Sequence, residues 1–188
     1  MGRLIVISGP SGAGKGTLIA RLLERSDRFR VATSATTRPR RRNETDGREY
    51  HFLSDAEFQT RVDRNDFLEH VSYAGGRYGT LRSEVEDVLA SGHDAILELE
   101  VDGAFNVRRR RPDATLVFID PPSFEDLEQR LTERATDSAG EISTRLAIAR
   151  EQLETKDAFD LVVVNDDRER AADELLAMLG GVPTEGNR

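Results

Sequence analysis

The sequence predicts an α/β fold, a parallel sheet of about five strands with helices packed on both faces. Short apolar runs alternate with helical patterns along most of the chain, a glycine-rich loop joins the first run to the first helix, and residues 35–80 interrupt the alternation. A chain of 188 residues can bury one substantial core, but it is too short for two ordinary domains unless one of them is small. We therefore predict a core formed by residues 1–34 and 81–188, with residues 35–80 inserted as a small α+β subdomain.

The first strand and the first helix flank the glycine loop. Leu4 to Ile7 form an apolar run, a helical pattern begins at Leu18, and the sequence GPSGAGKGT lies between them. Glycines let successive backbone N–H groups turn toward one anion, the helix N-terminus adds partial positive charge, and Lys15 adds a full charge. A tight turn that merely contains glycines is disfavoured, because strand, loop, lysine and helix follow one another in the expected order. The loop therefore predicts a phosphate-binding site.

The stretch that follows predicts a strand at 29–34 and then a cationic loop at 35–47, which contains Arg38, Arg40, Arg41 and Arg42. A small unit comes next, with a strand at 50–53 and another at 67–71. Between them, Ser54 and Glu57 form a capping box that begins a helix ending near Asp63. Glycines at 75, 76 and 79 are interpreted as turns.

The alternation resumes after this unit. We expect strands at 95–99, 115–119 and 161–164, helices at 82–91, 104–111, 123–133, 141–154 and 168–179, and a frayed tail from Gly180. In a sheet of this kind the ligand lies beyond the carboxyl ends of the strands. The segments 9–17, 34–50, 98–102 and 165–167 are all expected at that edge. Arg108 to Arg111 end a helix, where cations offset the helix dipole, and we assign them no catalytic role.

Composition excludes several classes of protein. The chain has no cysteine and 3 histidines, which rules out disulfides and thiolate-held zinc and disfavours a metal cage built from side chains. The net charge of −8 disfavours sequence-independent binding to nucleic acid or to anionic lipid. No apolar run approaches about 18 residues and no charged leader precedes an apolar segment. We expect a cytoplasmic enzyme with no nucleic-acid or membrane partner; monomer and homo-oligomer both remain open.

The motifs taken together resemble the guanylate kinase family over about residues 4–179. The resemblance is carried by GPSGAGKGTL, by SATTR ending at Arg38, by FLEH with Glu69, by RYGT with Tyr78 and Thr80, and by VNDD at 164–167. It implies a P-loop-type core, a helical lid at about 130–146, and residues 35–80 as the subdomain that binds the nucleoside monophosphate. The implied reaction is transfer of a phosphoryl group from ATP, with Mg²⁺ as cofactor, to GMP or dGMP.

The resemblance also implies a role for individual residues. The ATP-binding residues would be Ser11, Gly12, Ala13, Gly14, Lys15, Gly16, Thr17, Arg130, Arg134 and Asn165. The GMP-binding residues would be Ser34, Arg38, Arg41, Tyr50, Glu69, Tyr78, Thr80 and Glu100. Lys15, Arg38, Arg134 and Arg145 would be catalytic, by aligning the phosphates and neutralising their charge. Glu69 would read guanine, because a carboxylate can accept from its N1–H and its amino group together.

The chain departs from the family pattern near the expected metal. Gly16 stands where Ser or Thr usually supplies a hydroxyl, and Glu98 and Glu100 replace aspartates. We therefore assign no direct metal ligand. Mg²⁺ is expected to be held through the nucleotide, with Thr17 or Glu98 as candidates to reach it through water.

Two other functions are compatible with parts of this pattern. A non-catalytic interaction module related to the family would have no need of Lys15 or of the lid arginines. A kinase for another small phosphate, such as a ribose bisphosphate phosphokinase, would have no need of Glu69, Tyr78 and Thr80 as readers of a purine. The sequence favours the guanylate kinase reaction over both.

Overall fold

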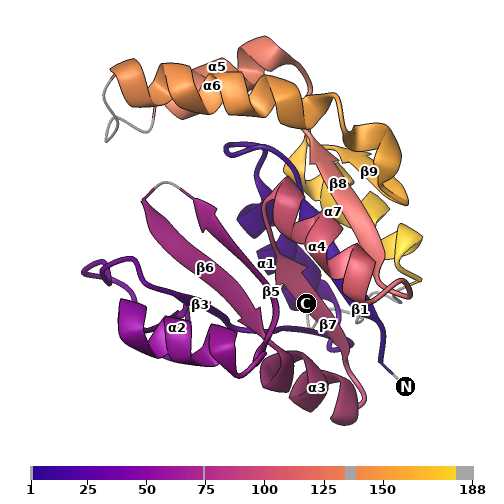
Figure 1. The fold of residues 1–188 in the computed structure, drawn as a ribbon. Helices are drawn as coiled ribbons and strands as arrows, with labels where there is room; N and C mark the ends of the chain where they lie inside the picture. Colours follow the sequence, from indigo (N-terminus) through magenta and orange to yellow (C-terminus); the bar gives the residue numbers. More distant parts are fainter. Residues whose placement is uncertain (1, 74, 134–138, 181–188) are drawn as a thin grey trace.

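The main sheet has five strands in parallel. The computed structural model describes residues 2–73, 75–133 and 139–180. The strands are β1 (Leu4–Ser8), β2 (Phe29–Val31), β7 (Asp94–Glu98), β8 (Thr115–Asp120) and β9 (Leu161–Val164), in the order β2-β7-β1-β8-β9 (Figure 1). Each neighbouring pair is parallel. The predicted fold class and the parallel five-stranded core are thus confirmed.

Helices cover both faces of this sheet. All five residues of β1 are buried, and its four apolar residues alternate between two apolar clusters. Ile5 and Ile7 pack with α1 (Lys15–Arg25) and α7 (Arg168–Met178). Leu4 and Val6 pack on the opposite face with α3 (Arg82–Ala90) and α4 (Val101–Arg110). Burial on both faces explains why β1 reads as a continuous apolar run.

A second, mixed sheet lies beside the main one. It contains β3 (Ser34–Thr36), β4 (His51–Phe52), β5 (Phe67–Tyr73) and β6 (Gly76–Leu81), in the order β4-β3-β6-β5. Helix α2 (Asp55–Asp63) begins at the capping box that the sequence predicts, since Glu57 N donates to Ser54 Oγ and Ser54 N donates to Glu57 Oε2. Phe58 and Phe67 stack in a small separate core, 4.5 Å between ring centroids.

Two predictions about this region are wrong. The strand expected at 29–34 is two strands, because the chain leaves the main sheet after Val31 and Ser34 pairs with Thr80 of β6. The segment 76–81, expected to contain turns, is strand β6. A Cβ at Gly79 would lie 2.8 Å from Phe67 Cδ1 and 3.0 Å from Glu69 O, so this glycine is needed for close packing rather than for a turn.

The helices α5 (Phe124–Thr132) and α6 (Ala139–Leu153) pack on each other through Leu127, Leu131 and Ala149. Figure 1 shows this pair and the second sheet projecting from the main sheet as two separate arms. A short 3₁₀ helix (Lys156–Ala158) leads from α6 to β9. Arg134 and the tail after Gly180 lie outside the described residues. No helix in the described ranges is long and apolar enough to cross a membrane.

Candidate active site

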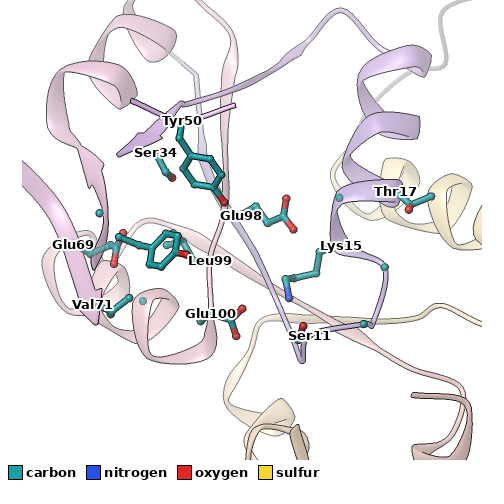
Figure 2. Close-up of a pocket in the computed structure, with 16 residues that line it drawn as sticks. Ser11, Lys15, Thr17, Ser34, Tyr50, Glu69, Val71, Glu98, Leu99 and Glu100 are labelled. Atoms are coloured by element: carbon teal, nitrogen blue, oxygen red, sulfur yellow. The ribbon is translucent and has the colours of Figure 1, made fainter. Parts of the chain in front are cut away.

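A cavity of about 520 Å³ opens between the glycine loop, the second sheet and the segment after β7. It brings together twelve of the residues named from the sequence. They are Ser11, Gly12, Gly14, Lys15, Gly16, Thr17, Ser34, Tyr50, Glu69, Tyr78, Glu98 and Glu100. Figure 2 shows Glu69 and Tyr50 on one side of the cavity, and Lys15 and Ser11 on the other. The sequence therefore located most of the lining, although the pieces lie far apart along the chain.

The glycine loop is shaped by backbone conformations that side chains disfavour. Gly12 and Gly14 have φ of 91° and 94°, and α1 begins directly after Gly14. Lys15 is buried, and its Nζ donates to Gly9 O at 2.6 Å and to Pro10 O at 3.2 Å. The ammonium group is thus held at the loop by the loop's own carbonyls, beside Ser11 (Figure 2).

Two side chains from later in the chain contact this loop, and a third holds one of them. The buried Asn165 donates from Nδ2 to Ala13 O at 2.7 Å, and a Cβ on Gly14 would lie 2.3 Å from that Nδ2. Arg130 donates to Asn165 O at 3.1 Å, and Arg145 donates to Ser11 Oγ. Asn165 therefore reaches the loop rather than lining the cavity, and Arg130 acts on the loop only by holding the backbone of Asn165. The position of Asn165 after β9 gave no signal for this bracing contact.

Glu69 lies at the other end of the cavity with one carboxylate oxygen unused. Its side chain is 2% exposed, and Oε1 accepts from Thr80 Oγ1 at 2.9 Å. Oε2 is buried and has no hydrogen-bond partner among the described residues. Burial raises the pKa of this carboxyl to about 7, against the hydrogen bonds from Thr80 and the charge of Arg110, which lower it. A buried acceptor with no partner is costly unless a ligand supplies a donor.

Gly103, at the start of α4, leaves space for that oxygen. A Cβ at this position would lie 3.2 Å from Glu69 Oε2 and 3.4 Å from Leu99 Cβ. The helix predicted at 104–111 begins directly after Gly103, whereas the structure places this glycine in the first turn of α4. The sequence does not show which group approaches it.

Arg38 lies beside the two tyrosines. Its guanidinium binds both oxygens of Glu44, at 2.9 and 2.8 Å, and lies 5.4 Å from the centroid of the Tyr50 ring. The bidentate bond from Arg38, helped by Arg41 N, lowers the pKa of Glu44 to about 2. Tyr50 and Tyr78 meet edge to face at 6.1 Å. An anion in this corner would find a guanidinium and two phenols, with Arg41 exposed nearby.

Glu98 ends β7, Glu100 follows it, and both side chains lie between the two ends of the cavity (Figure 2). Burial among protein groups, together with the charge of Glu100, raises the pKa of Glu98, and the charge of Lys15 lowers it. The side chain still reaches solvent, because it faces the open cavity. Glu100 Oε2 accepts from Gln152 Nε2 of α6 at 3.2 Å, a contact that the sequence did not suggest.

The place next to Glu98 is open because residue 16 is glycine. A Cβ on Gly16 would lie 3.6 Å from Glu98 Oε2. Figure 2 shows Glu98 pointing toward the Lys15 side of the cavity, whereas the exposed Thr17 side chain points away from both. Glu98 is therefore the better placed of the two candidate groups for a cation bound to a phosphate at the loop. In the described part of the chain, no three His, Cys, Asp or Glu side chains form a group that could hold a metal ion.

Comparison with known proteins places this geometry in a family. The chain matches the family described as guanylate kinase over residues 1–181. It is 46% identical to a guanylate kinase of Rubrobacter xylanophilus over 186 residues, which are 99% of this chain and 97% of the relative. It is also 46% identical to a guanylate kinase of Thermobifida fusca over 183 residues, 97% of this chain and 93% of the relative. Among solved structures, it is similar to a guanylate kinase from Anaplasma phagocytophilum, with a TM-score of 0.78 and 29% identity, covering 95% of this chain and 85% of the other.

Proposed function

The chain belongs to the guanylate kinase family, and we propose that its cavity transfers the γ-phosphoryl group of ATP to GMP, giving ADP and GDP. The observation that carries this proposal is the pairing of two unlike ends in one cavity. One end is a glycine loop with a buried lysine, and the other is a buried carboxylate with a free oxygen. A phosphate fits the first end, and a flat group with adjacent N–H donors fits the second.

The end of the cavity that contains Glu69 would select guanine. Guanine offers N1–H and an amino group side by side, so that the two oxygens of Glu69 can accept from both. Adenine presents an acceptor at N1 and would oppose the carboxylate with a lone pair. Thr80 and Ser34, paired across β3 and β6, supply further hydroxyls to this end. Glu100 is the second carboxylate near the base.

The phosphate of GMP would bind at the corner formed by Arg38, Arg41, Tyr50 and Tyr78. Arg38 is already held in a bidentate bond with Glu44, which fixes its guanidinium beside the tyrosines before any ligand arrives. A phosphate dianion would approach the face of this group that Glu44 leaves free, or would replace Glu44. We propose that residues 35–80 thereby act as the monophosphate-binding subdomain, together with Ser34.

The ATP phosphates would be held by the backbone N–H groups of the loop from Gly12 to Gly16 and by Lys15. The protein's task is alignment and charge neutralisation, since the acceptor is already a phosphate oxygen and no general base is required. Arg145, which contacts Ser11 of the loop, would add charge at the transferring group. We propose α5 and the first turns of α6 as the lid over this end, which would exclude water as a competing acceptor. Arg134 keeps its predicted role in that lid.

Mg²⁺ fits this site as a partner of ATP. The described residues offer one carboxylate, Glu98, next to the place that a side chain at residue 16 would occupy. Most ligands of the ion would then come from phosphate and water, as Mg²⁺ commonly prefers. The ion supplies charge neutralisation at the β- and γ-phosphates, and Glu98 would hold one of its water ligands. The cytoplasmic location stays a prediction from the sequence.

A coupled assay with ATP and a panel of acceptors tests the proposal. We expect turnover with GMP and with dGMP, since no residue in the cavity is placed to require a 2′-hydroxyl, and far slower turnover with AMP, UMP and ribose phosphates. Turnover with a ribose bisphosphate but not with GMP would favour the small-phosphate kinase. Absence of turnover with any acceptor would favour the interaction module.

GMP affinity should depend on the ionisation of Glu69. The free carboxyl has a pKa of about 7, and the donors of guanine favour its charged form, so binding should release a proton below that pH. The dissociation constant for GMP should therefore rise as pH falls, approaching about tenfold per pH unit well below the pKa of Glu69. Titration calorimetry from pH 5.5 to 8, in two buffers of different ionisation enthalpy, measures both effects.

The phosphate of GMP also titrates, near pH 6, and must be separated from this effect. Glu69→Gln provides the control, because the variant retains the phosphate and loses the carboxyl. In the variant, the dissociation constant for GMP should rise less steeply as pH falls, because one titrating group has been removed. Identical pH profiles for the two proteins would contradict the assignment of Glu69 as the titrating group.

A further inference from the structure

We propose that Arg110 is a positioning residue for base recognition, which holds the backbone of β5 so that Glu69 faces the cavity. This inference rests on the proposed function, since it concerns the reader of guanine. It also changes the interpretation of Arg108 to Arg111, which from the sequence were assigned only to the end of a helix.

The backbone of β5 is irregular just before Glu69. Phe67 pairs with Leu81 and Glu69 pairs with Thr80, so that Leu68 is an extra residue opposite β6, a β-bulge. In a regular strand Phe67 and Glu69 would point to the same face. Here Phe67 packs in the small core of the second sheet, Leu68 packs in the main core, and Glu69 enters the cavity. The bulge therefore sets the direction of the Glu69 side chain.

Arg110 binds this irregular backbone from another element. Its Nη1 donates to Phe67 O at 3.1 Å and to Leu68 O at 2.6 Å. Arg110 ends α4, which packs on the main sheet, whereas both carbonyls belong to β5 of the second sheet. One guanidinium thus links the two sheets at the residues directly before Glu69. A bulge lacks regular ladder partners, so a donor from outside stabilises it.

The charge of Arg110 also acts on the carboxylate. A smaller cavity of about 280 Å³ is lined by Glu69, His70, Asn106, Arg109 and Arg110. The positive charge of Arg110 opposes the burial that raises the pKa of Glu69, and burial together with that charge lowers the pKa of His70. The same side chain therefore favours both the direction and the ionised form that guanine requires.

The neighbouring arginines do not make equivalent contacts. Arg108 pairs with Asp160, Arg109 donates to Asn106, and Arg111 pairs with Asp113 at 2.8 Å. None of these partners belongs to β5. Arg111 is the matched control, because it has the same charge at the same helix end and a partner only two residues away. A general effect of charge on the helix dipole would be similar for the two positions.

The test compares Arg110→Gln, Arg110→Lys and Arg111→Gln in the coupled assay. Loss of two hydrogen bonds near the base predicts that Arg110→Gln raises KM for GMP by about tenfold or more. We expect kcat at saturating GMP and KM for ATP to change by less than about twofold, because the glycine loop is untouched. Arg110→Lys should recover most of the loss, and Arg111→Gln should resemble the unmodified protein. Because Arg110→Gln removes a charge that lowers the pKa of Glu69, GMP binding should also begin to weaken at a higher pH in this variant.

A double variant separates positioning from general stability. If Arg110 acts through Glu69, then Arg110→Gln combined with Glu69→Gln should bind GMP no more weakly than Glu69→Gln alone. Additive losses would overturn the proposal, as would an unchanged KM for GMP in Arg110→Gln or an equal effect of Arg111→Gln. Loss of folding in Arg110→Gln would overturn it too, because the contact would then be a requirement of the fold. Failure of the proposed function is distinguishable, since the unmodified protein would then not use GMP at all.

Discussion

Replacing Lys15 with alanine is expected to lower kcat by about a hundredfold to a thousandfold, the usual effect of removing one preorganised group that stabilises transition-state charge. Lys15 is buried at the glycine loop, where its ammonium group is held by Gly9 O and Pro10 O. ATP phosphates would compete for that ammonium with these two neutral carbonyls. Because the group is already in the loop, little rearrangement is needed when the nucleotide binds.

The same substitution should leave GMP binding almost unchanged. Glu69 and Thr80 lie in the second sheet, and Arg38 and Arg41 lie in the loop between β3 and β4; the hydrogen bonds of Lys15 Nζ go to Gly9 O and Pro10 O instead. Steady-state kinetics and calorimetry with GMP alone measure the two effects separately. The chain has one other lysine, Lys156, which pairs with Asp120 at 2.9 Å and does not line the cavity. Lys156→Ala is therefore the matched control, and unchanged turnover in Lys15→Ala would remove the glycine loop from the active site.

The local structure of the glycine loop could be predicted because the sequence information for it is local. A strand, a glycine loop, a lysine and a helix start occupy consecutive positions, and the backbone conformation of Gly12 and Gly14 follows from residue type. Even here the support of the loop was not predictable. Asn165 lies about 150 positions away in the sequence and meets Ala13 only because β9 ends beside β1 and β8 in the sheet.

The second sheet, which contains Glu69, was less predictable from sequence periodicity. Strand β6 was missed because glycines at 76 and 79 are usually turn residues, and only the ring of Phe67 against Gly79 shows why a strand needs one there. Glu69 was named through family resemblance. Its burial, its free oxygen and its raised pKa depend on a bulge and on neighbours from α4, which no spacing in the sequence encodes.

The partner of Arg110 could not be predicted from the sequence either. The position of Arg110 in a run of arginines at a helix end has an adequate local explanation, so no sequence pattern pointed to a second role. The contact with β5 depends on how α4 packs across the two sheets. Long side chains at element ends are thus poorly assigned from sequence, because their partners are fixed by tertiary structure.

Replacing Glu69 with glutamine should separate recognition from stability. The variant loses the charge that accepts from guanine, and each lost charged hydrogen bond is worth about 1.5 to 3 kcal/mol. We therefore expect kcat/KM for GMP to fall by about tenfold to more than a hundredfold. A glutamine amide can also donate to the N1 acceptor of adenine, so the preference for GMP over AMP should narrow. Assays with the two acceptors at matched enzyme concentration measure this ratio, and a preference unchanged by the substitution would refute the assignment of the base.

The same substitution should stabilise the fold at high pH, although it weakens the use of GMP. The pKa of Glu69 is raised in the folded state to about 7 from an ordinary value of 4.5, so its charged form is disfavoured by folding. That unfavourable contribution is absent at pH 4, grows as pH rises from 4.5 to 7, and is complete above pH 7. Glutamine carries no charge, and its oxygen can still accept from Thr80 Oγ1. The melting temperature of Glu69→Gln minus that of the unmodified protein should therefore be more positive at pH 8 than at pH 5. A variant that loses GMP use while gaining stability at pH 8 would identify Glu69 as a group kept for its ligand rather than for the fold, whereas loss of both together would indicate a structural role.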